Sequence, residues 1–371
     1  MYVWCHDTFT ETSVTNLDSR MNPGIFVQAL NPMTGKMEWK NQPEDYDYQQ
    51  ELARAAFADM LHDTERNKLY YEGLKSAIGM MRNRGEPVRV LDIGTGTGLL
   101  SMMAAKIGAD SITAIEEFRP MANCAEKIIK SNGYESKIKL IRKRSTEVQV
   151  GPGLDMEEKA NILVTEVFDT ELIGEAAISV FNHAHDQLLT ENCLVVPNFG
   201  TVFAQVVSSD ICSKWNGLHD IQLGNEKIAI PEDMRGSGAS SLALHDLQLS
   251  QIRQDQFEAV SEVLPIFDFD FGRLRNKEPI MKRRQSKKEF MPKSPKKADA
   301  IFMWWEIKMD PKNEITLSCA PIWAHPERME FLNQTKEMVS VSPKRAYRKN
   351  PSKSRKAHRP RCILIIRQIV R

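Results

Sequence analysis

The sequence predicts an α/β protein in which a Rossmann-like, doubly wound domain is followed by an antiparallel, β-barrel-like domain. Strand-like and helix-like patterns alternate between Val88 and Leu189, which is typical of a parallel sheet covered by helices. Three glycines join the first of these strands directly to a helix, as in folds that bind nucleotides. After Pro197 the alternation gives way to short, turn-bounded segments that resemble strands.

Length and composition set the broad class. The 371 residues predict two or three domains, and 42% hydrophobic with 27% charged residues exclude a chain that is disordered throughout. The apolar run Ile363–Ile366 is too short to span a bilayer, and the polar stretch Met1–Arg20 lacks the apolar centre of a secretory signal. Six cysteines stand singly, which argues against a zinc ribbon or a disulfide framework. We expect a soluble cytoplasmic or nuclear protein without a metal or a membrane partner.

The first domain is assigned element by element. An N-terminal extension and a segment rich in Pro, Asn and Gly are expected over residues 1–45. From Tyr46 to Met81 apolar residues recur at helical spacing, and Asp63 is placed to cap a second helix. Gly85 and Pro87 end this region. The pattern then predicts strands over 88–93, 111–115, 137–141 and 160–165, and helices over 99–106, 121–130 and 174–189.

The second domain is expected over residues 197–326, after an α/β domain over residues 46–196. Its strand-like segments are short and separated by turns, which predicts antiparallel pairing. These segments are 200–207, 221–230, 242–249, 300–308 and 314–320. A basic, disordered tail is expected over residues 327–371.

Charge is distributed unevenly along the chain, although the formal net charge is only +1. Eleven basic residues and no acidic one follow Glu337, and Arg273–Lys297 holds eleven basic residues against two acidic ones. The remaining body is strongly acidic, which suits a cationic substrate, whereas the basic segments suit nucleic acid, a membrane surface or nuclear import. Solvated loops are the simpler interpretation of both basic clusters.

The strongest local signal is an apolar strand that runs into a helix through Asp92, Gly94, Gly96 and Gly98. Glycines permit the tight turn and the close approach of backbone to a ligand. The spacing fits S-adenosylmethionine better than NAD, because no pyrophosphate has to rest on the helix N-terminus. Glu116 ends the next strand, where its carboxylate can accept both ribose hydroxyls. A tight structural turn is the alternative interpretation.

Acidic residues also follow the next two strands of the predicted sheet. Glu147 could accept from an adenine amino group, although a solvated loop carboxylate is an equal alternative. Four acids then fall within ten residues: Glu166, Asp169, Glu171 and Glu175. A hairpin through Gly174 would direct Glu166 and Glu175 into one pocket, which is costly unless a cation lies between them. A guanidinium fits such a site because its planar group forms paired hydrogen bonds with carboxylates. The alternative interpretation is that these are ordinary acidic residues of a loop and a helix start.

Together these residues resemble the protein arginine methyltransferases. The resemblance runs from about Met21 to about Pro326 and includes two stretches typical of one subfamily, Tyr46-Asp-Tyr-Gln-Gln-Glu51 and Ala58-Asp-Met-Leu-His-Asp63. It implies a Rossmann-like S-adenosylmethionine-dependent methyltransferase domain followed by a β-barrel-like domain for substrate binding and dimerisation. It also implies arginine-containing protein substrates, among them histones and RNA-binding proteins, and monomethylarginine as the product.

The resemblance further implies three groups of site residues. The cofactor-binding group, which would surround S-adenosylmethionine from its sulfonium to its adenine, comprises Met60, Arg66, Asp92, Gly94, Gly96, Gly98, Glu116 and Glu147. The catalytic pair that would clamp the guanidinium comprises Glu166 and Glu175. On the substrate side, Tyr46 would belong to a helix that closes over the cofactor, and Asp169 would crowd and charge the pocket.

Departures from the family keep other functions open. The subfamily carries a His-Trp pair near the substrate pocket and two tandem modules, whereas this sequence has no His-Trp dipeptide and one recognisable module. A cofactor-binding but catalytically impaired isoform is therefore one alternative, and a nucleic-acid-binding protein that uses the basic clusters is a weaker one. With one module we expect a homodimer or a poorly active monomer. The expected contact surface is Ser208–Ser237, with the apolar residues Ile211, Trp215 and Leu218.

Overall fold

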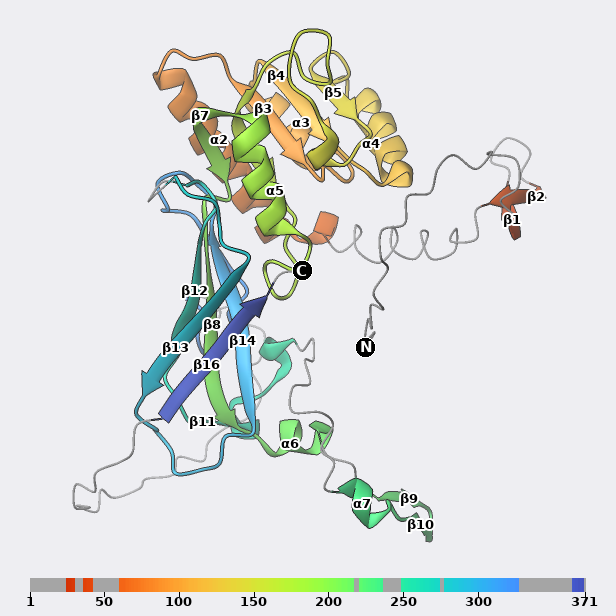
Figure 1. Cartoon of the computed structure of the whole chain (residues 1–371). Helices are drawn as coiled ribbons and strands as arrows, with labels where there is room; N and C mark the ends of the chain where they lie inside the picture. Colours follow the sequence, from red (N-terminus) through yellow and green to blue (C-terminus); the bar gives the residue numbers. More distant parts are fainter. Residues whose placement is uncertain are drawn as a thin grey trace, which may run out of the picture. The chain divides into compact units, whose positions relative to one another are not determined.

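The computed structural model describes residues 25–30, 36–42, 60–216, 220–235, 248–273, 277–326 and 362–369. Contacts divide the chain into two compact units, Met1–Asn67 and Lys68–Arg371, and each is described by itself. The α/β sheet and the long antiparallel sheet predicted from the sequence thus belong to one unit (Figure 1). The predicted domain limits at residues 45, 196 and 326 stay predictions.

The first unit contains a hairpin that the sequence pattern did not reveal. Strand β1 (Ile25–Leu30) pairs antiparallel with β2 (Met37–Gln42) over six residue pairs. Further along, helix α2 (Thr64–Asn83) begins directly after Asp63, whose Oδ1 accepts the backbone N–H of Arg66 at 2.9 Å. This side-chain bond satisfies one of the free N–H groups of the first helical turn, so the predicted cap is confirmed.

The predicted parallel sheet is confirmed. Its five strands lie in the order β5-β4-β3-β6-β7 and all neighbours pair in parallel. The order reverses between β3 and β6, and in sheets of this kind ligands bind outside the carboxyl ends of the strands at such a point. The strands are β3 (Arg89–Ile93), β4 (Ser111–Ile115), β5 (Ile138–Ile141), β6 (Ala160–Thr165) and β7 (Leu189–Val196).

The connecting helices agree with the prediction except for the last one. Helix α3 (Leu99–Ile107) and α4 (Arg119–Ser131) lie where the pattern placed them. The helix predicted over 174–189 is shorter, because α5 (Ala177–His183) passes into a π-helical turn (Ala184–Leu188) and Leu189 already begins β7. Strand β7 escaped prediction since its first half reads Leu-Thr-Glu-Asn, and only its second half, Cys193–Val196, is a buried apolar run.

The second sheet is antiparallel, as predicted, and is built around β8 (Phe199–Ser208). This strand pairs with β11 (Glu258–Ala259), β12 (Leu264–Asp270) and β14 (Ala300–Lys308), and β14 pairs with β15 (Thr316–Ser318). The pattern located β8, β14 and β15 but missed β11 and β12. In β12 the proline and the two aspartates interrupt any simple alternation.

Two predicted strands of this sheet are corrected. Residues 221–230 do not form one strand of the sheet: they form a separate hairpin of β9 (Ile221–Leu223) and β10 (Glu226–Ile228), turned at Gly224 with a φ of 61°. An added strand here would need Gly224 to be extended, whereas its left-handed conformation reverses the chain. The segment 242–249 lies outside the described residues up to 247, and Leu249 begins a short 3₁₀ turn.

The basic cluster Arg273–Lys297 and the tail contain strands rather than loops alone. Within the cluster, β13 (Arg283–Phe290) alternates between more and less exposed residues, and it pairs with β16 (Cys362–Ile369). The expectation of a tail disordered throughout is therefore wrong for 362–369. The run of β-branched residues in this segment favours a strand once a partner edge is present.

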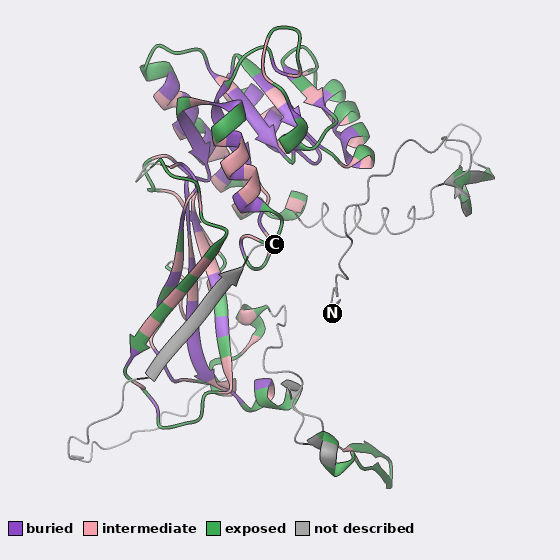
Figure 2. Cartoon of the chain, in the orientation of Figure 1, coloured by how far each residue is buried: buried purple, intermediate pink, exposed green. Residues whose placement is uncertain are grey.

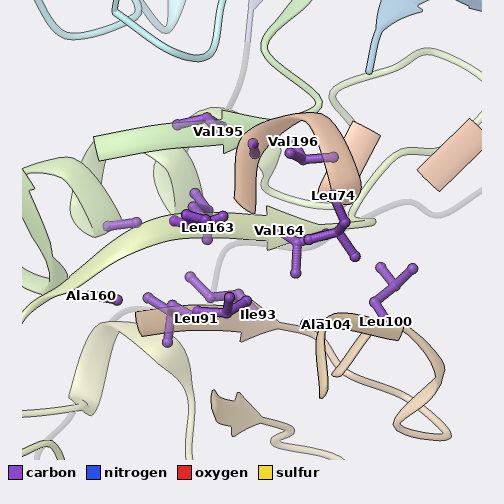
Figure 3. Packing of buried hydrophobic residues seen from close by; sticks show 14 of the residues in the cluster. Leu74, Leu91, Ile93, Leu100, Ala104, Ala160, Leu163, Val164, Val195 and Val196 are labelled. Carbon is purple, nitrogen blue, oxygen red and sulfur yellow. The ribbon is translucent and has the colours of Figure 1, made fainter. Parts of the chain in front are cut away.

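Buried side chains of both sheets belong to one core cluster, and buried residues occur in both sheets (Figure 2). In the close view, Leu91 of β3, Leu163 of β6 and Val195 of β7 come from neighbouring strands of the parallel sheet (Figure 3). The same cluster includes Phe181 of α5 and Phe271, which directly follows β12. Their ring centroids are 4.3 Å apart, so this end of the antiparallel sheet packs against α5. Among the described residues no helix is both long and apolar enough to cross a bilayer.

Candidate active site

The loop after β3 has the glycine geometry that its sequence predicts. Gly94, Gly96 and Gly98 adopt φ angles of 71°, 56° and 85°, a region that side chains other than glycine rarely adopt. The N–H groups of Gly94 and Thr95 both donate to the carbonyl of Ile115, at 2.9 and 3.0 Å, which ties the loop to the end of β4. Gly98 has a packing reason as well, because a Cβ there would lie 3.1 Å from Ile129 of α4. The loop therefore presents bare backbone at the carboxyl end of β3.

Glu116 closes this loop from the end of β4. Its side chain is buried, its Oε2 accepts the N–H of Gly96 at 2.9 Å and its Oε1 accepts the N–H of Phe118 at 2.9 Å. Burial raises the pKa of the carboxyl above its ordinary value, against the effect of the backbone donors. Each carboxylate oxygen retains a second lone pair, so the pair of oxygens can still accept two hydroxyl groups.

Asp92 lies beneath the same loop and is fully buried. Its Oδ2 accepts the hydroxyls of Thr95 and Ser101 at 2.6 and 2.7 Å, while Oδ1 has no hydrogen-bond partner among the described residues. Burial raises the pKa of this carboxyl to about 6, the two hydroxyls lower it, and nearby Glu116 raises it further. A buried acceptor without a partner is costly, and such groups concentrate at binding sites.

We expect Asp92→Asn to stabilise the fold at neutral pH and to remove part of its pH dependence. A carboxyl whose pKa is raised in the folded state binds its proton more tightly there, so its contribution makes stability fall as pH rises from about 4 to about 6. Above this range, ionisation of the buried Asp92 carboxyl lowers the free energy of unfolding by about 3 kcal/mol. An uncharged amide avoids part of this loss, so we expect the free energy of unfolding of the variant to be about 1–2 kcal/mol higher than that of the wild type. Urea unfolding at pH 4.5 and pH 7.5 measures both effects. Equal pH dependence in mutant and wild type would contradict this account.

The acid hairpin starts at Glu166, whose position is determined by its neighbour Thr165. The hydroxyl of Thr165 donates to the carbonyl of Ile93 at 2.7 Å, and its carbonyl accepts the hydroxyl of the buried Tyr70 of α2 at 3.1 Å. These two bonds join the ends of β6, β3 and α2. Glu166, which is half-buried, therefore leaves the sheet next to the glycine loop, and Gly94 lies opposite Val167.

Asp169 organises the hairpin as well as charging it. Its Oδ1 accepts the N–H groups of Glu171 at 3.1 Å and Gly174 at 3.0 Å, so the side chain caps the turn from inside. A Cβ at Gly174 would overlap the Asp169 carboxylate, which explains the glycine. The backbone carbonyl of Asp169 accepts the indole N–H of Trp305 from β14 at 2.9 Å. The antiparallel sheet thus holds the hairpin in place.

Glu175 completes the hairpin at the opposite side. It lies two residues before α5. Helix α5 is in turn anchored to the segment that leads into β13, because the side chain of Asn182 forms two hydrogen bonds with the backbone of Ile280, at 2.8 and 2.9 Å. Partial burial raises the pKa of the Glu175 carboxyl, and the charges of Glu166 and Asp169 raise it further. The structure thus brings these three acids together electrostatically, as predicted. In the described ranges no three His, Cys, Asp or Glu side chains are placed to hold a metal ion.

The remaining predicted residues are placed as follows. Glu147 is exposed and ends a 3₁₀ turn (Ser145–Glu147) after β5. In the first unit, the guanidinium of Arg66 lies 3.6 Å from the Met60 sulfur, so these two residues are neighbours. Tyr46 lies outside the described residues.

Sequence reasoning missed the residues that support the site. Thr95 and Ser101 share the Asp92 carboxylate, and Tyr70 and Trp305 position the acid hairpin. Thr95 and Ser101 lie three and nine residues after Asp92, so their proximity could have been inferred from the strand–loop–helix pattern. Tyr70 and Trp305 contact residues 95 and 136 positions away, and no local pattern signals such pairs.

Comparisons with known proteins agree with the fold. Residues 73–184 match the family described as ribosomal protein L11 methyltransferase (PrmA). Proteins named protein arginine N-methyltransferase 7 are 48% identical over 318 residues in Drosophila pseudoobscura pseudoobscura and 50% identical over 307 residues in Drosophila erecta. The matches cover 85% and 82% of this chain but 46% and 44% of those proteins, so the chain spans less than half the length of these curated relatives.

Two solved structures share the fold. The Trypanosoma brucei PRMT1 enzyme–prozyme heterotetrameric complex with AdoHcy superposes with a TM-score of 0.56 at 20% identity, and Arabidopsis thaliana protein arginine methyltransferase 10 with 0.51 at 16% identity. Each match covers 73% of this chain and 78% of the other chain. Because identity near one half extends over four-fifths of the sequence, this chain is similar over most of its length to part of the protein arginine N-methyltransferases, and it shares their fold.

Proposed function

We propose that this chain binds S-adenosylmethionine and transfers its methyl group to a guanidinium nitrogen of arginine in protein substrates. The observation that carries the proposal is the acid hairpin beside the glycine loop, in which partial burial and the charges of Glu166 and Asp169 raise the pKa of the Glu175 carboxyl. The repulsion between neighbouring carboxylates is lowered when a cation binds between them. The similarity of the chain to part of the protein arginine N-methyltransferases supports the same activity.

The loop residues fit S-adenosylmethionine. The positive φ angles leave bare backbone at the sheet edge, Glu116 has free lone pairs for ribose hydroxyls, and Asp92 offers a buried acceptor for a positively charged amino group. When bound, the cofactor supplies a methyl group on a sulfonium: the methyl carbon is the electrophile, and the sulfur departs as a neutral thioether. A related structure is named as a complex with AdoHcy, the product of such a transfer.

In the proposed reaction the chain's own residues bind and polarise the arginine. Its pKa exceeds about 12, so the guanidinium arrives charged and is held by Glu166 and Glu175. The two carboxylates attract the positive charge toward the bonded nitrogens and leave the free terminal nitrogen better able to attack. They also align that nitrogen for in-line transfer. The N–H proton displaced by the new N–C bond passes to a carboxylate or to water.

A matched pair of peptides tests the proposal. The chain is incubated with methyl-labelled S-adenosylmethionine and either an arginine-rich histone-tail peptide or the same peptide with every arginine replaced by lysine. We expect label in the first peptide alone, recovered as methylarginine. Label in neither peptide, or in both equally, would contradict the proposed activity.

The finer points of the proposal concern product and setting. Asp169 adds charge and bulk within the hairpin, which supports transfer of a single methyl group and hence monomethylarginine as the product. Histones and RNA-binding proteins are the proposed substrates, in the cytoplasm or the nucleus. Mass spectrometry of the labelled peptide measures the product: dimethylarginine as the main species would contradict the role proposed for Asp169.

A second candidate function is a cofactor-binding protein with impaired catalysis. It is favoured by the sequence of these 371 residues, which contains no His-Trp dipeptide. Calorimetry separates the two candidates, since this second one predicts full binding of S-adenosylmethionine without methyl transfer.

We further propose that the chain forms a homodimer through the segment 208–237. The sequence-based expectation rested on Ile211, Trp215 and Leu218. Ile211 is partly buried, and the side chains of Trp215 and Leu218 lie outside the description. Four other apolar side chains of this segment are about half-exposed: Ile221, Leu223, Ile228 and Met234. Exposed apolar groups of this kind mark contact surfaces, and a specific dimer would bury at least about 1,000 Å² in total.

Substitution of this hairpin is expected to dissociate the dimer. Ile221→Asp with Ile228→Asp places two charges on the proposed contact, so light scattering should report a monomer at concentrations where the wild type is dimeric. Leu154→Asp, at an exposed apolar residue far along the chain, is the matched control and should leave the dimer unchanged. A wild-type chain that is monomeric at all concentrations and fully active would refute the dimer.

A further inference from the structure

Strand β13 is attached to the antiparallel sheet by side chains rather than by a backbone ladder. The guanidinium of Arg284 lies 4.3 Å from the ring centroid of Phe269 and 5.1 Å from that of Phe267, and its Nη1 donates to the carbonyl of Asp268 at 2.7 Å. At the other end of β13, Phe290 is buried in a small apolar cluster with Leu264. These contacts orient β13 beside β12 without using the backbone groups of β13.

The backbone groups of β13 pair instead with the C-terminal strand. Within the described part of the chain, β16 is the only strand that is hydrogen-bonded to β13. The antiparallel register is continuous over eight residue pairs, from Arg283 opposite Ile369 to Phe290 opposite Cys362. Such a ladder carries little sequence information, because it depends on N–H and C=O groups that every residue except proline provides.

The β13–β16 pair differs from the strands of the sheet around β8 in how it is supported. A two-stranded ribbon is marginally stable by itself in water. Strand β13 is anchored by Arg284 and Phe290, whereas β16 is hydrogen-bonded, among the strands that the structure describes, to β13 alone. Loss of β16 would therefore leave β13 in place but without a hydrogen-bonded strand on the edge that β16 occupies, and such an edge is a template for another strand.

We propose that the backbone edge of β13 is a strand-acceptor site, and that the chain's own segment Cys362–Ile369 occupies it reversibly by β-strand addition. As part of the same chain, this segment has an effective concentration of the order of millimolar at the site, so it outcompetes free peptides of similar affinity. The ligand class is an extended peptide rich in β-branched residues and free of proline. Four of the eight β13 residues are basic and one is acidic, so acidic strands are favoured over the chain's own segment, which carries one basic and no acidic residue.

The test releases the C-terminal strand in the full-length chain. Successive N–H groups of a strand point to opposite edges, so Ile365→Pro combined with Ile366→Pro removes at least one bond to β13 whatever the phase of the ladder. Ile365→Val combined with Ile366→Val retains strand propensity and serves as the matched control. The probe is a fluorescent peptide of residues 362–371 in which serine replaces Cys362.

We expect the peptide to bind the proline variant at least about tenfold more tightly than the wild type or the valine variant. Hydrogen exchange over residues 283–290 should be faster in the proline variant and slow again when the peptide is added, with β3 and β6 unchanged as evidence that the variant is folded. Equal peptide binding to all three proteins, or no binding to a folded proline variant, would overturn the proposal.

A measurement on the wild type alone tests the reversibility. Reversible release predicts that the amides of β13 and β16 exchange together and faster than those of β14, which is paired on both edges. If β13 exchanged as slowly as β14, the C-terminal strand would be a permanent part of the sheet and the proposal would fail.

Discussion

Glu175→Gln is expected to lower methyl transfer at least about 100-fold while S-adenosylmethionine binds as in the wild type. Loss of one charged contact in the transition state typically has an effect of this size. Glu166→Gln is expected to behave in the same way, because the two carboxylates act on the same guanidinium. Steady-state rates with an arginine peptide and calorimetry with the cofactor measure the two properties separately.

The pH dependence of the reaction provides an independent check on Glu175. Its pKa is raised by partial burial and by the charges of Glu166 and Asp169, and the cation is bound by the ionised form. The rate at low substrate should therefore rise with pH as Glu175 loses its proton, and this limb should disappear in Glu175→Gln. Glu171→Gln is the matched control, since Glu171 is an exposed acid of the same hairpin that does not contribute to the shift at Glu175. Wild-type turnover in both the Glu166 and Glu175 variants would return the hairpin to an ordinary acidic loop.

Gly96→Val is expected to abolish binding of S-adenosylmethionine. Gly96 has a φ of 56°, and a β-branched residue in this conformation is strained by about 1–3 kcal/mol. Relief of the strain would move the N–H that donates to Glu116, so the carboxylate that is proposed to bind the ribose would lose its position as well. Calorimetry should detect no heat of binding at cofactor concentrations that saturate the wild type.

Gly79→Ala provides the control for this substitution. Gly79 lies in α2 with a negative φ and open space where a Cβ would be, so alanine should leave cofactor binding unchanged and stabilise the helix by up to about 1 kcal/mol. Thermal unfolding of both variants shows whether each is folded. A Gly96→Val protein that is folded and binds the cofactor normally would contradict the assignment of the loop.

Much of the parallel sheet could be predicted from the sequence because its signals are local. Strands β3, β4, β5 and β6 are short apolar runs that end in glycine, acidic or polar residues, and the helices between them carry an apolar face. The turn from the buried strand β3 into a helix requires positive φ angles, which the three glycines after β3 adopt without steric cost. The clustering of Glu166, Asp169 and Glu175 follows from a hairpin of ten residues, which is again a local property.

The sequence by itself thus determined the fold class, the glycine loop and the identity of the acids at the sheet edge. Tertiary structure alone decided how they are held: Tyr70 fixes Thr165, and Trp305 fixes the carbonyl of Asp169. It also decided that a basic segment and the C-terminal residues 362–369 pair as β13 and β16. The physical reason is distance along the chain. Periodicity and turn chemistry report on neighbouring residues, whereas a hydrogen bond or a strand pair between residues some 70 to 140 positions apart depends on the packing of the whole unit.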